Sequence, residues 1–421
     1  MHFRQIYLLI ITTALFITSC EKLPSEPSST KSDIKTDASG VNYWGQEYND
    51  FGHAVIQTAD GGYAVVGSQY STSNQEDLQL VKFDSELDEK TAEKIIYSGT
   101  GDDSTYNSYA NDIQQTADGG YVTVGSSFNG SNYDVQVVKF SPQLTVEWQD
   151  TIKGDYNDFG NSIQQTTDGG YVVCGTQYDG TDEDIMLWKI TVTTVDNVDT
   201  PSYTVLYNPE SVTDNNTIEY GNYVQQTSDG GYVLIATIST GIQVTKLTSD
   251  GTTVTFNTAD TGCDEGNIVK QLDDGSYIII GNKEGGTGQQ SEVCINTFTS
   301  AGVAGTPITM GGAYDDKAKS IMQTEDDGFV FTGSQYNSST GDDLWVVKLK
   351  SNLTTDWSVL YGGSYNDNGA SIMQTDDGGY IVAGSSVSSD KQSQIMLLKI
   401  ESDGCVWSED RSTKISCGFG L

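Results

Sequence analysis

The chain has 421 residues and a formal net charge of −37, with 58 acidic against 21 basic residues. A surface this acidic repels phosphate backbones, so we expect no nucleic-acid partner, whereas solubility outside the cell and weak cation binding are favoured. The 46 glycines are typical of a turn-rich all-β protein.

Residues 1–20 have the layout of a secretory signal. Arg4 precedes the apolar run Ile6–Ile17, which is too short to cross a membrane as a helix. The run leads into Thr18-Ser19-Cys20, and small residues before a cysteine resemble the lipobox of bacterial lipoproteins. We therefore expect a lipoprotein signal peptide that ends at an acylated Cys20. The alternative is an ordinary signal peptide with an incidental cysteine.

Acylation would anchor the protein in the bacterial cell envelope, at the outer membrane or the cell surface, because several acyl chains hold a protein on a membrane. Residues 21–40 are rich in Ser, Pro and Lys and poor in apolar side chains, which predicts a disordered tether. The folded part is expected at residues 41–421, as a monomer.

One heptapeptide, for example Gln165–Tyr171, recurs seven times along the chain. Its aspartate falls at Asp60, Asp118, Asp168, Asp229, Asp274, Asp326 and Asp377. The copies lie between 45 residues (Asp229 to Asp274) and 61 residues (Asp168 to Asp229) apart. Repeats of this length indicate propeller blades or solenoid units and not independent domains.

Each repeat predicts four short antiparallel strands. In the third copy, Ser162–Thr166 and Tyr171–Gly175 flank the turn Thr167–Gly170, where Asp and Gly are the residues that a tight turn demands. Ile185–Ile190 predicts a third strand, and a fourth precedes the next repeat, as at Glu147–Ile152. The sequence thus predicts an all-β, seven-bladed β-propeller of four-stranded antiparallel blades. A parallel β-helix is the structural rival, but its coils are shorter and lack such hairpins.

Both termini are candidates for the fourth strand of the closing blade. Trp44–Asp50 aligns with Tyr361–Asp367, which is the end of a fourth strand, so the chain is expected to start inside a blade. At the other end, Cys405-Val406-Trp407 aligns with Asp356-Trp357 through its tryptophan. Whether the N-terminal strand closes the ring, or the C-terminal strand, or both share the blade, stays open.

Two repeats are longer than the others. The extra residues are Asp84–Lys94 in the first interval and Thr191–Asn216 in the third. Insertions in a repeat array map to loops on one face, so we expect loops at both places.

The repeats resemble the DGGY-type blades of bacterial seven-bladed β-propeller lipoproteins and secreted proteins. Tyr365–Tyr380 is the fullest copy, and the likeness covers roughly residues 41 to 410. The resemblance implies the fold and a bacterial surface location. It implies no reaction, because the family is defined by its blade.

Five cysteines follow Cys20, since the chain has six in all. An exported protein keeps disulfides, and Cys405 with Cys417 would close a short C-terminal loop. Cys263 and Cys294 belong to one repeat and are a second candidate pair. Cys174 occupies a strand position held by Val, Ile or Ala in other repeats, which indicates a buried free thiol. The spacings do not resemble a zinc site.

One slot of the predicted innermost strand is glutamine in every repeat. The seven residues are Gln57, Gln115, Gln165, Gln226, Gln271, Gln323 and Gln374. They form either a polar ring that lines the central channel or, in the interpretation we favour, amides that satisfy backbone groups between adjacent blades. The DGGY aspartates are likewise expected to form turns before they bind ligands.

The loops before the first strands combine tyrosine with Asn and Asp, and they share a face with the loops between the second and third strands. Aromatic rings beside Asn and Asp suit stacking on sugars or peptide, with hydrogen bonds fixing orientation. The alternative is turn chemistry alone. The candidate ligand-binding residues are Tyr48, Asn49, Asp50, Tyr70, Tyr156, Asn157, Asp158, Tyr178, Tyr314, Asp315, Asp316, Tyr336, Tyr365, Asn366 and Asp367.

No catalytic centre is expected. His53 is the one histidine after the signal, and other repeats have Asn161 or Ala370 in its slot, which favours a loop residue over a general base. No G-x-S-x-G elbow accompanies it. Asp315 and Asp316 are possible Ca²⁺ ligands, but there is no full D-x-D-x-D-G loop, so no cofactor is expected and calcium is a minority alternative.

These observations predict a surface-tethered, non-enzymatic propeller that binds an extracellular protein or glycan through its loop face. The first alternative is a carbohydrate-active enzyme with a carboxylate pair at the channel mouth. The second is a purely structural component of the envelope.

Overall fold

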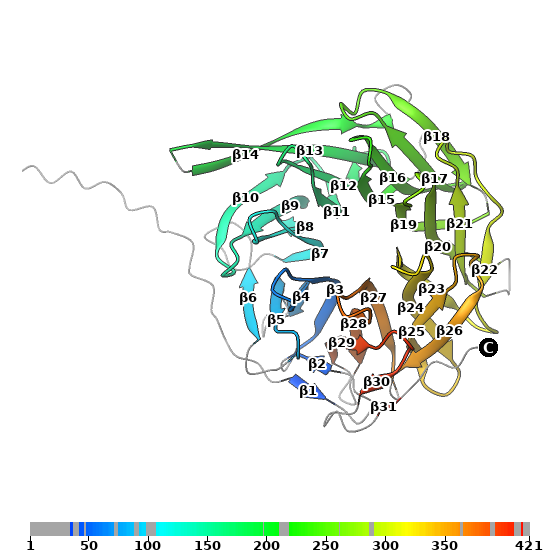
Figure 1. Cartoon of the computed structure of the whole chain (residues 1–421). Coiled ribbons are helices and arrows are strands. Elements are labelled where there is room, and N and C mark those ends of the chain that lie inside the picture. The colour runs from blue at the N-terminus through cyan, green and yellow to red at the C-terminus, as the bar shows by residue number, and fades with distance from the viewer. Residues whose placement is uncertain are drawn as a thin grey trace, which may run out of the picture.

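The computed structural model describes residues 34–36, 42–45, 48–70, 75–87, 92–97, 107–196, 198–209, 219–260, 262–285, 290–362, 365–387, 392–407 and 414–415. Across these residues, seven antiparallel sheets stand around a central axis (Figure 1). The predicted all-β, seven-bladed β-propeller is therefore confirmed. The expected signal peptide and Cys20 lie outside the described residues. No helix that would reach across a membrane occurs in the described ranges.

The blades are numbered along the chain, and each is given from its innermost strand outward. Blade 1 contains β3 (Asp50–Gln57), β4 (Tyr63–Tyr70), β5 (Glu76–Phe83) and β6 (Glu93–Tyr97), and blade 2 contains β7 (Ser108–Gln115), β8 (Tyr121–Phe128), β9 (Tyr133–Phe140) and β10 (Val146–Ile152). Blade 3 contains β11 (Asp158–Gln165), β12 (Tyr171–Tyr178), β13 (Glu183–Val195) and β14 (Val198–Tyr207), and blade 4 contains β15 (Glu219–Gln226), β16 (Tyr232–Ile238), β17 (Gly241–Leu247) and β18 (Val254–Asp260).

The remaining blades complete the ring. Blade 5 contains β19 (Glu265–Gln271), β20 (Tyr277–Lys283), β21 (Glu292–Phe298) and β22 (Ile308–Met310), and blade 6 contains β23 (Asp316–Gln323), β24 (Phe329–Asn337), β25 (Gly341–Leu349) and β26 (Thr355–Tyr361). Blade 7 contains β27 (Asp367–Gln374), β28 (Tyr380–Val387), β29 (Ser393–Ile400) and then β2 (Asn42–Trp44) and β1 (Ile34–Thr36). The first chain segment therefore completes the last blade.

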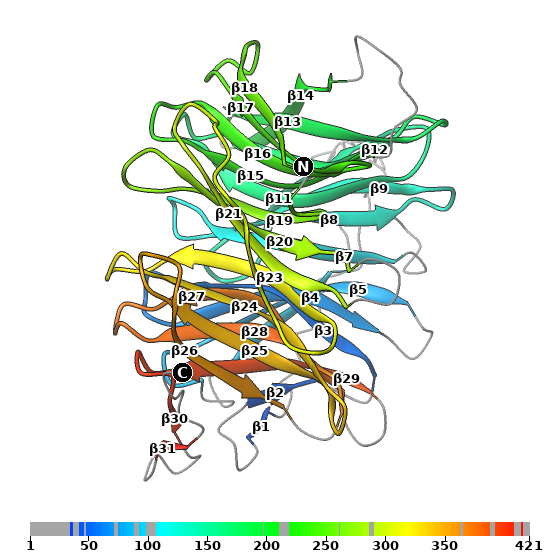
Figure 2. The same cartoon turned by 90° about the vertical axis from the view of Figure 1, so that its right-hand side faces the viewer.

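The two faces of the ring are named here by the connections they carry (Figure 2). The turn face carries the DGGY turns between first and second strands. The loop face carries the loops before each first strand and those between the second and third strands. Because antiparallel strands reverse direction at every connection, the two kinds of connection fall on opposite faces.

The repeated Asp-Gly pair folds as a tight hairpin turn. In blade 3, Thr166 N donates to Gly170 O over 2.8 Å, and Gly169 has a φ of +84°, which glycine adopts without steric cost. The Asp168 carboxylate accepts hydrogen bonds from Thr166 Oγ1 (2.5 Å) and Gly170 N (3.1 Å). The aspartate forms the turn, as the sequence predicted.

A lysine from the third strand completes this turn in six blades. The ion pairs are Lys82–Asp60 (2.7 Å), Lys139–Asp118 (2.9 Å), Lys189–Asp168 (2.6 Å), Lys246–Asp229 (3.0 Å), Lys348–Asp326 (2.9 Å) and Lys399–Asp377 (2.6 Å). In blade 5 the register places Thr297 where the other blades have lysine. Burial raises the pKa of Asp326, but the Thr324 hydroxyl and the Lys348 ammonium lower it to about 2 overall.

The glutamine that recurs in the innermost strands joins neighbouring blades through its side-chain amide. Gln57 Oε1 accepts a hydrogen bond from Asp376 N of blade 7 (2.9 Å), and Gln115 Oε1 accepts one from Ala59 N of blade 1 (2.8 Å). Equivalent bonds of 2.8 to 2.9 Å are made by Gln165, Gln226, Gln271 and Gln374. For these six residues the structure confirms the amide bridge between blades, and each bridge fixes a turn of the preceding blade.

Each innermost strand also carries a bulge at the same place. In blade 1 the register shifts between Gly52 and Ala54, which isolates His53. A bulge re-aims the extra side chain, and His53 Nδ1 bonds the carbonyl of Ala110 in the next blade over 2.8 Å. In blades 2 to 5 the extra residue of the bulge is an asparagine whose side-chain amide donates a hydrogen bond to a carbonyl oxygen of the next blade. These residues are Asn111, Asn161, Asn222 and Asn267. His53 therefore lies within a strand, and not in a loop as the sequence suggested.

The apolar core is divided among the blade boundaries. One cluster, for example, joins Val137 and Trp148 of blade 2 to Tyr171 and Val173 of blade 3, and all four side chains are buried. A four-stranded sheet alone would leave both of its faces wet, and each buried large apolar side chain contributes about 1.5–3 kcal/mol. Closure of the ring therefore covers every blade on both sides.

The N-terminal strand β2 closes the ring. Asn42, Tyr43 and Trp44 pair with β29 as the fourth strand of blade 7, and the Trp44 ring packs against Phe83 of blade 1 with centroids 5.3 Å apart. Trp44 is 1% exposed. The chain does start inside a blade, as its alignment predicted. Within the range expected to be a tether, β1 adds a fifth strand against β2.

A buried polar cluster supports this seam. With its amide oriented to satisfy its neighbours, Gln79 donates to Asp50 Oδ1 (2.9 Å) and accepts from Trp44 Nε1 (3.1 Å). Lys94 Nζ donates to Gln69 Oε1 over 2.9 Å. Burial lowers the pKa of Lys94 to about 8, and the charge of Asp50 acts in the opposite direction. The cluster ties the N-terminal strand to blade 1 as well as to blade 7.

The C-terminal segment lies outside the blade ladder. β30 (Val406–Trp407) pairs with β31 (Lys414–Ile415) and not with β29, so the alternative in which Cys405–Trp407 closes the ring is wrong. The register with β29 is already filled by β2. Cys405 is disulfide-bonded, and its expected partner Cys417 lies outside the described residues.

The bonding state of three further cysteines follows from where they lie. Cys263 and Cys294 form a disulfide with their Cα atoms 5.7 Å apart, which links the loop before β19 to β21 of the same blade. Cys174 is a buried free thiol, as predicted, and burial raises its pKa to about 12.

One expected insertion is a hairpin arm and not a loop. β13 and β14 run beyond the ring, with Val195 paired to Val198 at the tip of the described ladder (Figure 1). The segment is rich in Val and Thr, which favour strands, so it pairs with itself when no neighbouring blade reaches it. Val195 and Val198 are 61% and 63% exposed.

Candidate functional site

The aspartates among the predicted ligand residues are mostly buried. Asp50, Asp158 and Asp316 are 0% exposed and Asp367 is 1% exposed, each at the loop-face end of an innermost strand. Asp316 Oδ2 accepts a hydrogen bond from Gly312 N in the loop that leads to it. A Cβ on the nearby Gly311 would lie 2.5 Å from the same oxygen. These carboxylates hold the loop in place and do not face the solvent.

The residue before each of these aspartates clips two blades together. Asn157 Oδ1 accepts from Tyr133 N of the preceding blade (3.0 Å), and Asp315 Oδ1 accepts from Ser291 N (2.9 Å). The same clip is made by Asn49, Asn107 and Asn366. Their side-chain oxygens are thus committed to the framework. In blade 5 the slot belongs to Cys263, whose disulfide to Cys294 stays within the same blade and therefore does not replace the clip.

The tyrosines of these loops remain accessible. Tyr156 stacks edge-on against Tyr178 with centroids 5.3 Å apart, and Tyr314 lies against Tyr336 at the same distance. The exposed fractions are 45% for Tyr156, 42% for Tyr314, 40% for Tyr336 and 40% for Tyr365, while Tyr48, Tyr70 and Tyr178 are half-buried. The structure therefore brings the predicted aromatic residues together in pairs on two sides of the loop face.

A second aromatic group lies at the channel mouth, and sequence reasoning did not assign it. The position two residues before the extra residue of each bulge is aromatic in blades 1 to 4 and polar in blades 5 to 7. In chain order the residues are Phe51, Tyr109, Phe159, Tyr220, Glu265, Lys317 and Asn368. The innermost strands surround the central opening (Figure 1), and this position lies towards their loop-face end, so we call it the rim position.

Tyr133 connects two members of this rim. Its ring lies 6.2 Å from Tyr109 of the same blade and 6.1 Å from Phe159 of the next, measured between centroids. Phe128 packs against Tyr133 at 5.3 Å, and Phe51 packs against Tyr70 at 6.2 Å. All of these side chains are half-buried. The signal in the sequence was the departure of one slot from its repeat, aromatic in some copies and charged in others.

The electrostatics of the loop face are uneven. Burial, together with the charge of the buried Asp134, raises the pKa of Asp158 to about 7, and a hydrogen bond from Gln177 opposes the shift. In blade 6, burial raises the pKa of Asp342, the Lys317 ammonium lowers it, and the Asp315 carboxylate raises it again. Asp134 and Asp158 are 1% and 0% exposed, so this carboxylate pair has no access to a substrate.

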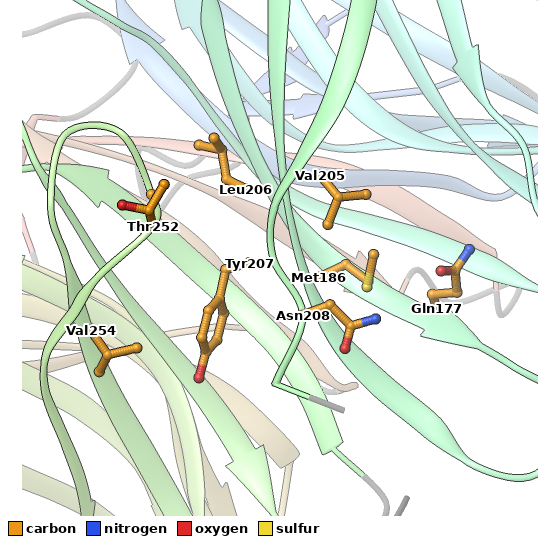
Figure 3. Close-up of a pocket in the computed structure, with 9 residues that line it drawn as sticks. Gln177, Met186, Val205, Leu206, Tyr207, Asn208, Thr252 and Val254 are labelled. Carbon is orange, nitrogen blue, oxygen red and sulfur yellow. The ribbon is translucent and has the colours of Figure 1, made fainter. Parts of the chain in front are cut away.

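A groove in the described part of the chain lies elsewhere (Figure 3). It has a volume of about 520 Å³ and lies between the outer strands of blades 3 and 4. Its lining mixes apolar and polar side chains, and the residues are Gln177, Met186, Val205, Leu206, Tyr207, Asn208, Gly251, Thr252 and Val254. Tyr207 is the one titratable side chain among them.

No metal-binding cluster is assembled in the described ranges, and His53 has a structural partner. No group of three or more His, Cys, Asp or Glu side chains is arranged there to hold a metal ion. Burial lowers the pKa of His53, while its bond to Ala110 and the charge of Glu76 raise it. Since His53 acts in the series of inter-blade donors, its imidazole has a structural role that asparagine fills in other blades.

No protein-family model matches the chain, and no curated protein matches it. Similar solved structures include Sqt1 from Chaetomium thermophilum, with 11% identity over 92% of this chain and 91% of that chain and a TM-score of 0.49. The Dos1 propeller shares 12% identity over 85% and 95% of the two chains (TM-score 0.48), and the Neurospora crassa Pan2 WD40 domain shares 10% over 89% and 99% (TM-score 0.46). A Trypanosoma rangeli sialidase matches at a TM-score of 0.43, with 54% of its length covered. Likenesses this distant carry no functional argument, so the propeller assignment rests on the strand pairings themselves.

Proposed function

We propose that the protein is a lipid-anchored binding scaffold of the bacterial cell envelope, a member of the DGGY-type propeller lipoproteins, which presents its loop face to an extracellular protein or glycan. One observation carries the binding role. On the loop face the Asn and Asp side chains are committed to the framework, whereas the tyrosines stay exposed in stacked pairs. Exposed aromatic rings on a rigid support are the residues that most often anchor partners.

The anchoring part of the proposal rests on the sequence of residues 1–20. Cys20→Ala is expected to release the protein from the membrane fraction and to abolish incorporation of labelled fatty acid. Retention of the variant in the membrane, with label still incorporated, would contradict acylation at this cysteine.

The binding part is tested with residues 21–421 of the chain. The purified protein is screened on a glycan array and against envelope and secreted proteins, with and without Ca²⁺, beside a triple variant Tyr156→Ser, Tyr314→Ser and Tyr365→Ser. The proposal expects a ligand that the triple variant loses while its unfolding transition is unchanged. A ligand that the variant retains in full would place recognition away from these tyrosines.

The carbohydrate-active enzyme is the second candidate. A pair of loop-face carboxylates in blade 6 favours it to a limited extent. The charge of Asp315 raises the pKa of Asp342, and the charge of Lys317 lowers it. Hydrolysis of a glycan panel by the wild type, lost in Asp342→Asn, would establish this activity and displace the binding role.

A further inference from the structure

Two carboxylates lie at the loop-face ends of third strands in blades 1 and 3, beside the aromatic residues. Glu76, the first residue of β5, is the register partner of Tyr70, whose ring contacts Phe51 with centroids 6.2 Å apart, and its charge acts on Tyr109 of the next blade. Glu183, the first residue of β13, is the register partner of Tyr178, and its charge acts on Tyr220 of the next blade. Each carboxylate therefore stands beside a rim aromatic residue contributed by the following blade.

We propose that this aromatic and acidic half of the channel mouth binds lysine or arginine side chains of a protein partner. The inference rests on the proposed function, since it names what the loop face recognises. The face of an aromatic ring attracts a cation, and the attraction grows where the rings are partly withdrawn from water. Tyr133 holds such a half-buried group together. Its ring centroid lies 6.2 Å from that of Tyr109 and 6.1 Å from that of Phe159.

The carboxylates favour a ligand with a positive charge. Glu76 beside Tyr70 and Tyr109 repels an anionic group and attracts an ammonium or guanidinium. The net charge of −37 adds a long-range attraction for basic segments that rises at low ionic strength. A neutral sugar would use the rings but would gain nothing from the two interleaved carboxylates.

The surroundings favour a protein side chain over a free amine. Exposed tyrosines flank the mouth on the same face, at Tyr156 and at the pair Tyr314 and Tyr336, and offer contact area around a bound cation. Glu76 and Glu183 also provide two acidic positions, so that a segment with two or more basic residues engages both. Linked cations bind more tightly than single ones when both positions are reached.

The experiment measures binding of four probes to residues 21–421 by calorimetry and saturation-transfer NMR at low and at physiological ionic strength. The probes are tetralysine, Nα-acetyl-lysine N-methylamide and the neutral Nα-acetyl-norleucine N-methylamide, with tetramethylammonium as a free cation. Tetralysine is expected to bind more tightly than single lysine by more than fourfold. The norleucine probe is expected not to bind.

Charge alone is separated from the rings by matched variants. Tyr133→Leu keeps the net charge and is expected to weaken tetralysine binding about three- to tenfold. Tyr133→Phe keeps the ring and should bind as the wild type does. Glu76→Gln should weaken binding and reduce its salt dependence, whereas Tyr203→Leu, at an exposed tyrosine of the outer strand β14, should leave this affinity unchanged.

Three outcomes would overturn the inference. They are equal binding of the lysine and norleucine probes, wild-type affinity in both Tyr133→Leu and Glu76→Gln, and tetramethylammonium binding as tightly as tetralysine. An unfolding curve for each variant shows that the comparison concerns folded protein. If these tests fail while the tyrosine triple variant still loses a screened ligand, the binding scaffold stands and only the cationic ligand is rejected.

Discussion

The turn face and the loop face are made by the same seven blades, but they distribute their chemistry differently. On the turn face, six blades repeat one Asp–Lys ion pair and the glutamine bridge fixes each turn to its neighbour. On the loop face, the rim position changes from Phe51 in blade 1 to Lys317 in blade 6. The comparison teaches that repeated residues build the ring on both faces, since the clips of the loop face recur as well, but that only the loop face also carries positions that differ from blade to blade.

Two blade-specific features near the loop face also stabilise the ring, namely the closing strand with Trp44 and the Cys263–Cys294 disulfide. The buried Asp158 belongs instead to a slot that recurs in blades 1, 6 and 7. Each can be tested against a matched residue of the repeated framework.

The largest expected effect concerns ring closure. Trp44→Ala removes a side chain that is 1% exposed and packs on Phe83, so we expect a loss of about 3–5 kcal/mol in the free energy of unfolding. Hydrogen exchange should show the amides of β2 and β29 losing protection together. The control is Trp357→Ala, which removes a buried tryptophan from β26, the fourth strand of blade 6, and leaves the closing strand intact. Full protection of β29 in Trp44→Ala would show that the seam does not depend on this strand.

The disulfide is expected to have the next largest effect. It closes a loop with a sequence separation of 31 residues, for which the loss of chain entropy in the unfolded state corresponds to about 3–4 kcal/mol. Urea unfolding of Cys263→Ser/Cys294→Ser should show that loss, and Cys174→Ala serves as a control for removal of a cysteine that forms no disulfide. A change below about 1 kcal/mol would contradict a stabilising role for this link within blade 5.

On the turn face we expect an asymmetry between partners. The side chain of Lys348 is 4% exposed and that of Asp326 is 64% exposed. Asp326→Asn leaves a buried ammonium without its counter-charge and should cost roughly 1–3 kcal/mol, whereas Lys348→Met leaves a carboxylate in water and should cost less than about 1 kcal/mol. Asp274→Asn in blade 5, where Thr297 replaces the lysine, should change the urea midpoint least. Equal losses in all three variants would contradict this reading of the ion pair.

A further effect depends on pH. The pKa of Asp158 is raised from 3.8 to about 7 in the folded protein, so its stabilising contribution is complete below pH 4 and is lost as the pH rises through 7. Asp158→Asn should therefore match the wild type at pH 4 and gain stability over it at pH 8, by at most about 1.4 kcal/mol per pH unit between these limits. Urea midpoints at the two pH values measure this difference. Parallel pH profiles for the two proteins would refute the shift.

Much of the fold followed from the sequence because the repeat displays it seven times. The DGGY turn at Asp168, the glutamine at Gln115 and the start of the chain inside a blade at Trp44 were all predicted, since each is a local pattern or an alignment between copies. The closing strand was left open because Trp407 matches the pattern equally well, and only the register on β29 excludes it.

The candidate site was less accessible to sequence reasoning. The tyrosines at Tyr156 and Tyr314 were found, but the burial of Asp158 and Asp316 was not, because loop composition does not tell which side chain turns inward. The rim was missed because Glu76 and Tyr109 lie on different strands of neighbouring blades, and their proximity depends on how two sheets pack.

The central claim is that blade-specific residues of the loop face bind the partner, while repeated residues only build the ring. The most direct test is the affinity of tetralysine for two variants that keep the net charge, Tyr133→Leu on the rim and Gln226→Leu in the glutamine bridge, measured where both are folded. The account predicts an affinity three- to tenfold weaker for Tyr133→Leu and an unchanged affinity for Gln226→Leu, which instead unfolds at lower urea. Equal affinities in the two variants, or a loss confined to Gln226→Leu, would contradict it.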